Sequence, residues 1–206
     1  GWANQRSAPF AERVRTCQQA VAKENAGRSR GRTLYAPSLY GHRDEMRTQI
    51  DLARREGVRL VLIAPMVCGV ATLVSLKREF GDMMFIAHPS LGGLRIAPQA
   101  LFGKLFRLFG ADAMIFPNYG GRFSYPREVC QAIARHNTQA WHELHPTLPT
   151  PAGGMSIERA GEIVREYGRD SMLLIGGALL AEHEQLAARS TEFVNAVAAA
   201  AEAVTA

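Results

Sequence analysis

Short apolar runs alternate with amphipathic stretches along the chain from about residue 33 onward. The clearest apolar run covers residues 59–65, and its continuous Leu, Val and Ile suit a strand that is covered on both faces of a sheet. Apolar residues at helical spacing then predict a helix that ends near Phe80. This alternation is typical of parallel strands joined by crossover helices. The pattern therefore predicts an α/β fold without a linker that would divide the chain.

The same pattern predicts six strands, each followed by a helix, and one further helix at the beginning of the chain. The predicted strands cover residues 33–38, 59–65, 83–89, 111–117, 147–154 and 171–180, and the predicted helices cover residues 8–26, 43–56, 66–80, 98–109, 126–136, 157–167 and the segment from about 184. A complete eightfold barrel needs about 250 residues and two more strands. Two architectures stay open at this point: an open, doubly wound sheet of six units, or a barrel without its first two strands.

Composition excludes several classes of protein. Of the 206 residues, 47% are hydrophobic and 21% are charged, which is ordinary for a folded globular domain. The apolar runs are too short to span a bilayer and the chain does not start with a secretion signal, so we expect a cytoplasmic protein with no membrane partner. The formal net charge is +5, but the arginines are scattered and the one cluster, residues 28–33, has no aromatic neighbours, so no nucleic-acid partner is expected. The three cysteines are widely spaced, without a CxxC pair, and are interpreted as reduced structural thiols.

Two glycine pairs are the first candidates for a binding site. In either architecture ligands bind beyond the carboxyl ends of the strands. Gly153 and Gly154 end one predicted strand, and Gly176 and Gly177 lie near the end of the next. Glycine lets backbone N–H groups approach an anion closely, so the two pairs predict a phosphate site. The alternative is that they form only tight turns.

His88 and Arg122 are the candidate catalytic residues. His88 ends its predicted strand, where an imidazole could exchange a proton near neutral pH, although a histidine in this place can also be structural. Arg122 lies in the glycine-rich "NYGGRF" segment, where a guanidinium could bind a phosphate or carboxylate of the substrate, or simply lie at the surface.

No metal site is predicted within this chain. His142, Glu143 and His145 are close together in "WHELH", but their spacing differs from the zinc-binding HExxH helix. Carboxylates, which hard cations prefer, do not directly follow any predicted strand.

Several segments resemble the large subunit of RuBisCO and the RuBisCO-like proteins. "LPTPAGGMSIERAGEIVREYGRDSMLLIGGALL" is similar to the seventh and eighth strand region of that family, with its Gly-Gly turn, helix, acidic connection and Gly-Gly strand end in the same order. "FIAHPSLGG" resembles the fifth strand, "LFRLFGADAMIFPNYGGRF" the sixth strand with its mobile loop, and "APFAERVRTCQQAVAKE" the helix after the second strand. The resemblance implies a TIM (β/α)8-type barrel, a substrate phosphate held by Gly153, Gly154, Gly176 and Gly177, and His88 beside a metal-bound substrate.

Three departures from the carboxylases accompany this resemblance. Carboxylases carry a histidine on the sixth strand and a lysine on the following loop, whereas this chain has Phe116 and Arg122 in those regions. The serine that usually precedes the seventh-strand glycines is Ala152. The chain is therefore similar to form IV, the RuBisCO-like proteins. That implies Mg²⁺-dependent enolisation chemistry by a decarboxylase, enolase or isomerase acting on a phosphorylated sugar or keto-sugar acid.

The resemblance also implies partners and missing parts. The family's metal ligands lie at the end of the second barrel strand, which would precede Gly1, so Mg²⁺ ligands are expected upstream of this chain. Residues 1–206 would then be six of eight strand–helix units of the C-terminal barrel, without the N-terminal α/β domain and inactive alone. A phosphorylated small-molecule substrate and a homodimer or higher homo-oligomer are the expected partners. A genuine ribulose-bisphosphate carboxylase, a non-catalytic phosphate-binding domain and an unrelated six-strand α/β domain stay open as alternatives.

Overall fold

The computed structural model describes residues 5–29, 31–92, 95–121 and 123–204. The chain forms two compact units. The first unit comprises Gly1–Leu91 with Phe109–Asp112, and the second comprises Gly92–Leu108 with Ala113–Ala206. Each unit contains a pair of parallel strands with helices packed against them, so the predicted α/β class is confirmed.

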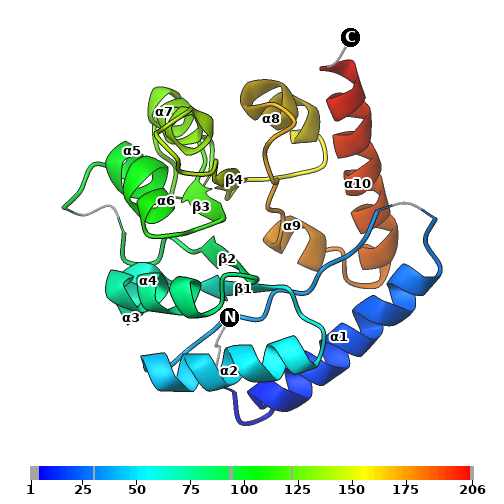
Figure 1. Ribbon diagram of the computed structural model, residues 1–206. Helices are drawn as coiled ribbons and strands as arrows, with labels where there is room; N and C mark the ends of the chain where they lie inside the picture. Colours follow the sequence, from blue (N-terminus) through cyan, green and yellow to red (C-terminus); the bar gives the residue numbers. More distant parts are fainter. Residues whose placement is uncertain (1–4, 30, 93–94, 122, 205–206) are drawn as a thin grey trace. The chain divides into compact units, whose positions relative to one another are not determined.

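The first unit is built around strands β1 and β2. Its elements are α1 (Phe10–Ala26), α2 (Arg43–Arg55), β1 (Leu60–Ile63), α3 (Pro65–Cys68), α4 (Val70–Glu79) and β2 (Met84–Ala87). The two strands are parallel, with Val61 opposite Phe85, and Ser38 bridges to Leu62 on the other side of β1. Helix α2 packs against α1 and α4 (Figure 1). The predicted strand over residues 33–38 is therefore present only as one parallel bridge.

The apolar face of each element explains this packing. Val61, Ile63 and Phe85 are fully buried in the strands, and Ile50 and Leu73 are fully buried in the helices beside them. Gly57 follows α2 with φ 84°, a left-handed conformation that favours glycine, and so ends the helix where the sequence predicts.

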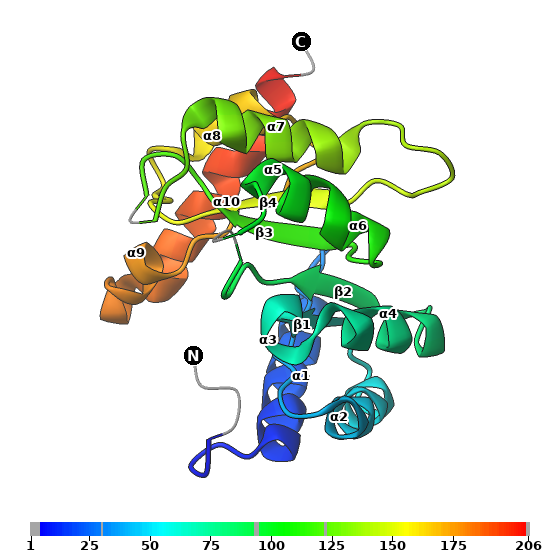
Figure 2. The same ribbon diagram turned by 90° about the vertical axis from the view of Figure 1, so that its left-hand side faces the viewer.

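The second unit is built around strands β3 and β4. Its elements are α5 (Pro98–Ala100), a π-helical turn (Leu101–Leu105), α6 (Phe106–Leu108), β3 (Ala113–Pro117), α7 (Arg127–Thr138), β4 (Leu148–Ala152), α8 (Ala160–Tyr167), α9 (Gly177–Leu180), a 3₁₀ turn (His183–Gln185) and α10 (Leu186–Ala203). Helices α5, α6 and α7 lie beside β3 and β4 (Figure 2), and α10 packs along α8. Phe102, Phe106, Met114 and Phe116 fill the core between these helices and strands.

The sixth predicted strand, residues 171–180, is wrong over most of its length. Only Leu174 bridges to Ala152, and the chain then turns into helix α9 at Gly177. The change has a local cause, because the carbonyl of Gly176 accepts hydrogen bonds from the N–H groups of Leu179 and Leu180 and so starts a helical turn. The glycine pair therefore lies at the start of a helix rather than inside a strand.

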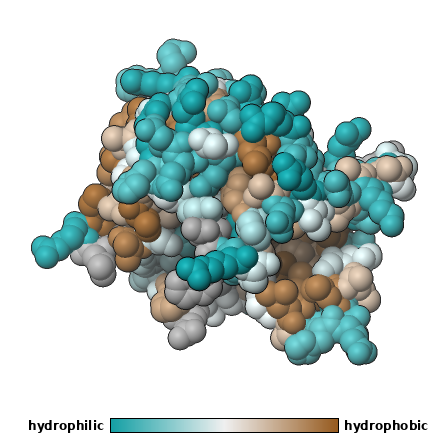
Figure 3. Space-filling model, turned by 90° about the horizontal axis from the view of Figure 1, so that it is seen from below, coloured by the Kyte–Doolittle hydropathy of each residue, from teal (hydrophilic) through white to brown (hydrophobic). Residues whose placement is uncertain are grey.

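Large apolar side chains are exposed on both units. They include Val67 and Leu91 in the first unit and Leu180 and Val194 in the second. On the face drawn in Figure 3, hydrophobic side chains lie in small groups among hydrophilic ones. Among the described residues, no helix has the length and apolar character needed to cross a membrane.

Candidate active site

His88 lies directly after β2 in the first unit. Its backbone N–H donates to the carbonyl of Ile63 over 2.8 Å, so the ladder between β1 and β2 holds the residue at the carboxyl end of both strands. The imidazole Nδ1 lies 3.2 Å from the backbone nitrogen of Ser90 and 2.7 Å from the Ser90 hydroxyl. A backbone N–H can only donate, so Nδ1 accepts, and the neutral ring carries its proton on Nε2.

Burial keeps this ring neutral. Loss of solvation lowers the pKa of His88 from its usual 6.5, because the charged form is the one that burial disfavours. A proton on Nδ1 would also point at the N–H of Ser90, which donates in the opposite direction. Nε2 has no hydrogen-bond partner among the described residues. His88 is therefore arranged as a neutral donor through Nε2–H rather than as a cation.

A cavity of about 580 Å³ adjoins His88 in the first unit. Its lining includes Leu39, Met46, Val67 and Cys68 together with His88 and Ser90. Burial raises the pKa of the Cys68 thiol, which leaves it a weak nucleophile at neutral pH. Lining residues of the described chain include no carboxylate, and the described residues contain no group of three or more potential metal ligands. They do not by themselves fit a Mg²⁺ ion, which prefers carboxylate oxygens.

The two glycine pairs come together in the second unit. Ala152 bridges to Leu174, so Gly153–Gly154 and Gly176–Gly177 follow the ends of neighbouring parallel segments. The N–H groups of these four glycines donate no hydrogen bond to another described residue. A Cβ atom added at Gly153, Gly176 or Gly177 would meet nothing within 4 Å. Unpartnered donors beside open space are what an anion site built from backbone needs.

Gly154 has a second reason to be glycine. Its φ is 64°, and an added Cβ would lie 2.8 Å from the carbonyl oxygen of Gly120 and 2.9 Å from the Cα of Gly121. The loop after β3 and the turn after β4 therefore touch through their backbones, which only residues without a side chain allow. The close backbone contact at Gly154 fits the tight-turn interpretation, and the phosphate interpretation of the pair stays a prediction.

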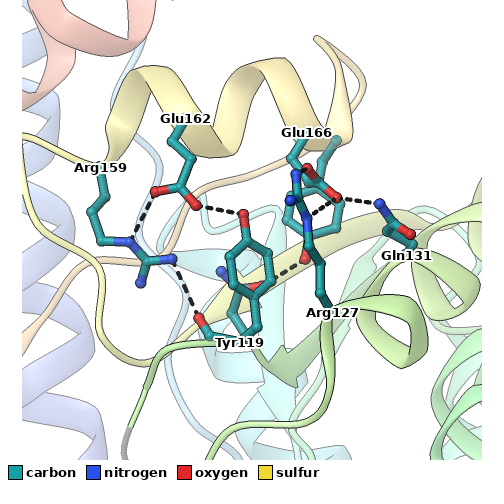
Figure 4. Close-up of polar contacts among 8 residues, drawn as sticks. Tyr119, Arg127, Gln131, Arg159, Glu162 and Glu166 are labelled. Atoms are coloured by element: carbon teal, nitrogen blue, oxygen red, sulfur yellow. Dashed lines mark hydrogen bonds and ion pairs between the residues drawn. The ribbon is translucent and has the colours of Figure 1, made fainter.

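A charged cluster joins these two loops (Figure 4). The hydroxyl of Tyr119, in the loop after β3, donates to Glu162 over 2.7 Å, and Arg159 donates to the carbonyls of Gly154 and Tyr119. Arg127 and Gln131 of α7 both donate to Glu166 of α8. Burial, and then the bond to Glu162, raises the pKa of Tyr119 to about 12. The Tyr119 hydroxyl and the Arg159 guanidinium lower the pKa of Glu162, so this carboxylate stays charged.

The other residues singled out from the sequence lie in different places. Arg122 lies outside the described residues. Phe116 is fully buried and packs edge-on against Tyr167, with ring centroids 5.9 Å apart, so it is a core side chain. His88 lies in the first unit and the glycine pairs in the second. Sequence reasoning missed Ser90, Tyr119 and Arg159, because their roles depend on contacts between loops and not on any local motif.

Known proteins resemble this chain over nearly all of its length. It is 49% identical over 202 residues to a protein of Rhodospirillum rubrum named 5-methylthioribulose-1-phosphate isomerase. The matched region covers 98% of this chain and 54% of that protein. It is 48% identical over 199 residues to ribulose bisphosphate carboxylase-like protein 1 of Rhodopseudomonas palustris, covering 96% of this chain and 54% of the relative. The chain thus spans about half the length of these curated relatives. No protein-family model matches it.

Solved structures of RuBisCO-like proteins and of RuBisCO also resemble this chain. The RuBisCO-like protein from Rhodopseudomonas palustris superposes with a TM-score of 0.88 at 44% identity, covering 96% of this chain and 54% of that one. A RuBisCO from Pyrococcus horikoshii, at 22% identity, superposes with a TM-score of 0.86 over 95% of this chain and 48% of its own, which shows a shared fold. The α/β fold thus matches the C-terminal barrel domain of RuBisCO. Sequence and structure together show that this chain belongs to the RuBisCO-like family.

Proposed function

We propose that this chain belongs to an isomerase that acts on 5-methylthioribulose 1-phosphate or a closely related phosphorylated keto sugar. The observation that carries the proposal is the 49% identity, over 98% of the chain, with a relative named for that reaction. Relatives named 2,3-diketo-5-methylthiopentyl-1-phosphate enolase reach 29% over 83% of the chain. Both names describe chemistry next to the carbonyl of a phosphorylated, methylthio-bearing sugar chain, so the isomerase and the enolase share one reaction class.

The glycine pairs are the proposed phosphate site. Four N–H groups that donate to no described residue follow neighbouring parallel segments, and there is open space beside the Cα atoms of Gly153, Gly176 and Gly177. Backbone donors hold a phosphate without adding a side-chain charge that would need a counterion. This assignment keeps all four glycines of the sequence prediction.

His88 is the proposed donor to the reacting oxygen. Removing a proton from the carbon next to a carbonyl leaves negative charge on the carbonyl oxygen, and a fixed donor stabilises that charge. The neutral ring offers Nε2–H for this purpose, because Ser90 occupies Nδ1. Arg122 remains the proposed second ligand for the substrate's phosphate or carboxylate.

The remaining parts of the prediction are also proposals. We propose that residues 1–206 supply six of the eight strand–helix units of a barrel and that the protein works as a homodimer. The family resemblance implies Mg²⁺, but the described residues around His88 offer no carboxylate to hold it. The roles proposed for His88, Arg122 and the four glycines therefore do not depend on a metal.

The test is an assay of the full-length protein that contains this chain. With 5-methylthioribulose 1-phosphate in D₂O, we expect isomerisation with deuterium incorporated next to the carbonyl. Proton and phosphorus NMR spectra monitor the reaction. Parallel reactions contain the diketo phosphate, or ribulose 1,5-bisphosphate with labelled CO₂. Turnover of the diketo phosphate alone would replace the isomerase with an enolase. Fixation of labelled CO₂ into ribulose 1,5-bisphosphate would refute both assignments in favour of a carboxylase.

A further inference from the structure

Arg159 lies between the turn after β4 and helix α8, and it contacts that turn, which belongs to the proposed phosphate site, and the loop after β3 that touches it. Its Nη1 donates to the carbonyl of Gly154 over 2.9 Å, and its Nη2 donates to the carbonyl of Tyr119 over 3.3 Å. Its Nε donates to Glu162 over 3.3 Å (Figure 4). The three nitrogen atoms of one planar guanidinium therefore bond a loop, a turn and a helix to one another.

Holding these carbonyls fixes the neighbouring N–H groups. A peptide group is planar, so the N–H that follows a carbonyl points in the opposite direction. The carbonyl of Tyr119 thus sets the direction of the Gly120 N–H, and the carbonyl of Gly154 sets that of the Met155 N–H. Neither N–H donates to another residue in the described chain. Arg159 thereby aims two unpartnered donors without itself having to touch a ligand.

The two loops need such a connection because backbone contact alone gives them little to pack. Gly121 approaches Gly153 so closely that an added Cβ would lie 2.8 Å from its carbonyl carbon. Glycines contribute neither side-chain packing nor conformational restraint, so the turn would be mobile without other contacts.

Tyr119 supports the arginine from the other side. Its ring lies 5.4 Å from the guanidinium carbon of Arg159 and 5.5 Å from that of Arg127, and its hydroxyl donates to Glu162. The Arg159 side chain is only 23% exposed. Cation–π contacts and a shared carboxylate therefore hold the guanidinium in one place.

We propose that Arg159, supported by Tyr119, is a positioning residue that presets the Gly153–Gly154 turn and the Gly120 loop for a phosphate group. The proposal rests on the proposed function, because it assumes that these glycines bind the phosphate of the substrate. It adds a residue that acts through the backbone and not by direct contact with the substrate.

The test compares three variants of the full-length protein. Arg159→Met removes the charge and all three hydrogen bonds, whereas Arg159→Lys keeps the charge but cannot hold three acceptors in one plane. We expect both to raise the Kd of inorganic phosphate, measured by titration calorimetry, about tenfold, which corresponds to the loss of one hydrogen bond to a charged group. KM for the phosphorylated substrate should rise by a similar factor, with kcat changed less than about threefold. Arg165→Met is the matched control, because Arg165 is an exposed arginine of helix α8, which directly follows Arg159. The phosphate affinity of this variant should equal that of the wild type.

Each outcome has one meaning. Wild-type phosphate affinity in a folded Arg159→Met protein would refute the positioning role, and wild-type affinity in Arg159→Lys alone would replace it with simple charge attraction. A wild-type protein that binds no phosphate would refute both this inference and the proposed function. If the wild type binds phosphate but fails to isomerise the sugar, while both Arg159 variants bind phosphate weakly, the positioning role stands and only the proposed reaction is wrong.

Discussion

The two units carry different kinds of candidate chemistry. In the first unit the candidate group is a side chain, His88, which adjoins a cavity lined by both apolar and polar residues and is kept neutral by burial. In the second unit the candidate ligand groups are backbone N–H donors, and charged side chains around them bind one another. An imidazole depends on its tautomer, whereas a backbone site depends on the shape of its loops. The first is therefore sensitive to a single side chain and to pH, and the second to changes that move the backbone.

A half-buried lysine in the first unit and a buried arginine in the second show the same contrast. Lys77 in the first unit donates to the carboxylate of Asp112 over 2.6 Å, and that carboxylate also accepts from the N–H of Phe85. Arg107 in the second unit, 3% exposed, donates instead to four backbone carbonyls between residues 136 and 145. The second unit thus repeatedly uses arginine to fix loop backbone, as it does at Arg159.

The largest effect should follow His88→Ala. Loss of the Nε2–H donor should lower kcat of the full-length protein by about 100-fold or more, the usual cost of removing one donor to a developing oxyanion. His88→Gln keeps an N–H donor and should recover part of the loss. His145→Ala serves as the control, since His145 is exposed and contributes only its backbone carbonyl to a hydrogen bond. Unchanged turnover in a folded His88→Ala protein would remove His88 from the mechanism.

Backbone shape in the second unit is tested by Gly154→Ala against Gly153→Ala. Both positions have positive φ, 64° and 85°, so each alanine should cost about 1 kcal/mol of conformational strain. At Gly154 the new Cβ would also lie 2.8 Å from the Gly120 carbonyl oxygen, whereas at Gly153 it would meet nothing within 4 Å. We expect Gly154→Ala to lower the unfolding free energy by about 1–3 kcal/mol more than Gly153→Ala in urea titrations. Equal losses would show that the two loops are not in contact in solution.

The sequence predicted the regular elements better than the loop contacts. Strands β1 to β4 lie inside the predicted runs. Continuous apolar residues predict β1 to β3, whereas β4, with the sequence LPTPA, lacks such a run and was predicted from its place before the Gly153–Gly154 pair. The run at 171–180 was misread as a strand because "LLIGGALL" is apolar throughout, and apolarity alone does not separate a short strand from a short buried helix. In the structure Leu174 makes the one bridge of this segment to β4. After it, the backbone N–H groups of Leu179 and Leu180 donate to the carbonyl of Gly176, so the segment continues as a helix.

The candidate site was predictable only where a local motif carries it. Glycine pairs after strands are visible in the sequence, and so is a histidine at a strand end. The hydrogen bonds of Arg159 to Gly154 and Tyr119 connect residues up to 40 positions apart. Ser90 acts on His88 through a backbone N–H that every residue type except proline possesses. Contacts of this kind become visible only once the loops have positions in space.

A smaller effect should separate the carboxylates of the two units. Glu166 accepts from Arg127 and Gln131, and its side chain is 7% exposed, whereas Glu79 in the first unit accepts from Arg43 and Arg47 and is 27% exposed. Glu166→Gln should lower the unfolding free energy at pH 7 by about 1 kcal/mol, and Glu79→Gln by less than about half of that. The bond from Arg127 lowers the pKa of Glu166, so this contribution is present above the carboxyl's ordinary pKa of 4.5 and is lost as the pH falls through the lowered value. Urea titrations at pH 7 and pH 4 check both statements, and equal losses for the two variants at pH 7 would show that the greater burial of Glu166 adds nothing.

The smallest effect concerns the protonation of His88. Burial lowers its pKa below 6.5 in the folded protein, so the unfolded chain takes up a proton first as the pH falls. The wild type should therefore lose stability relative to His88→Gln once the pH drops below 6.5, and this relative loss should level off below the lowered pKa of the folded state. The acid limb of kcat/KM, which reports the free enzyme, should lie in the same window, because the neutral ring with Nε2–H is the active form. Paired urea titrations of the two proteins between pH 8 and pH 5, together with the pH profile of the wild type, measure both. An acid limb that lies above pH 6.5 and disappears in His88→Gln would mean that a nearby negative charge, and not burial, governs this histidine.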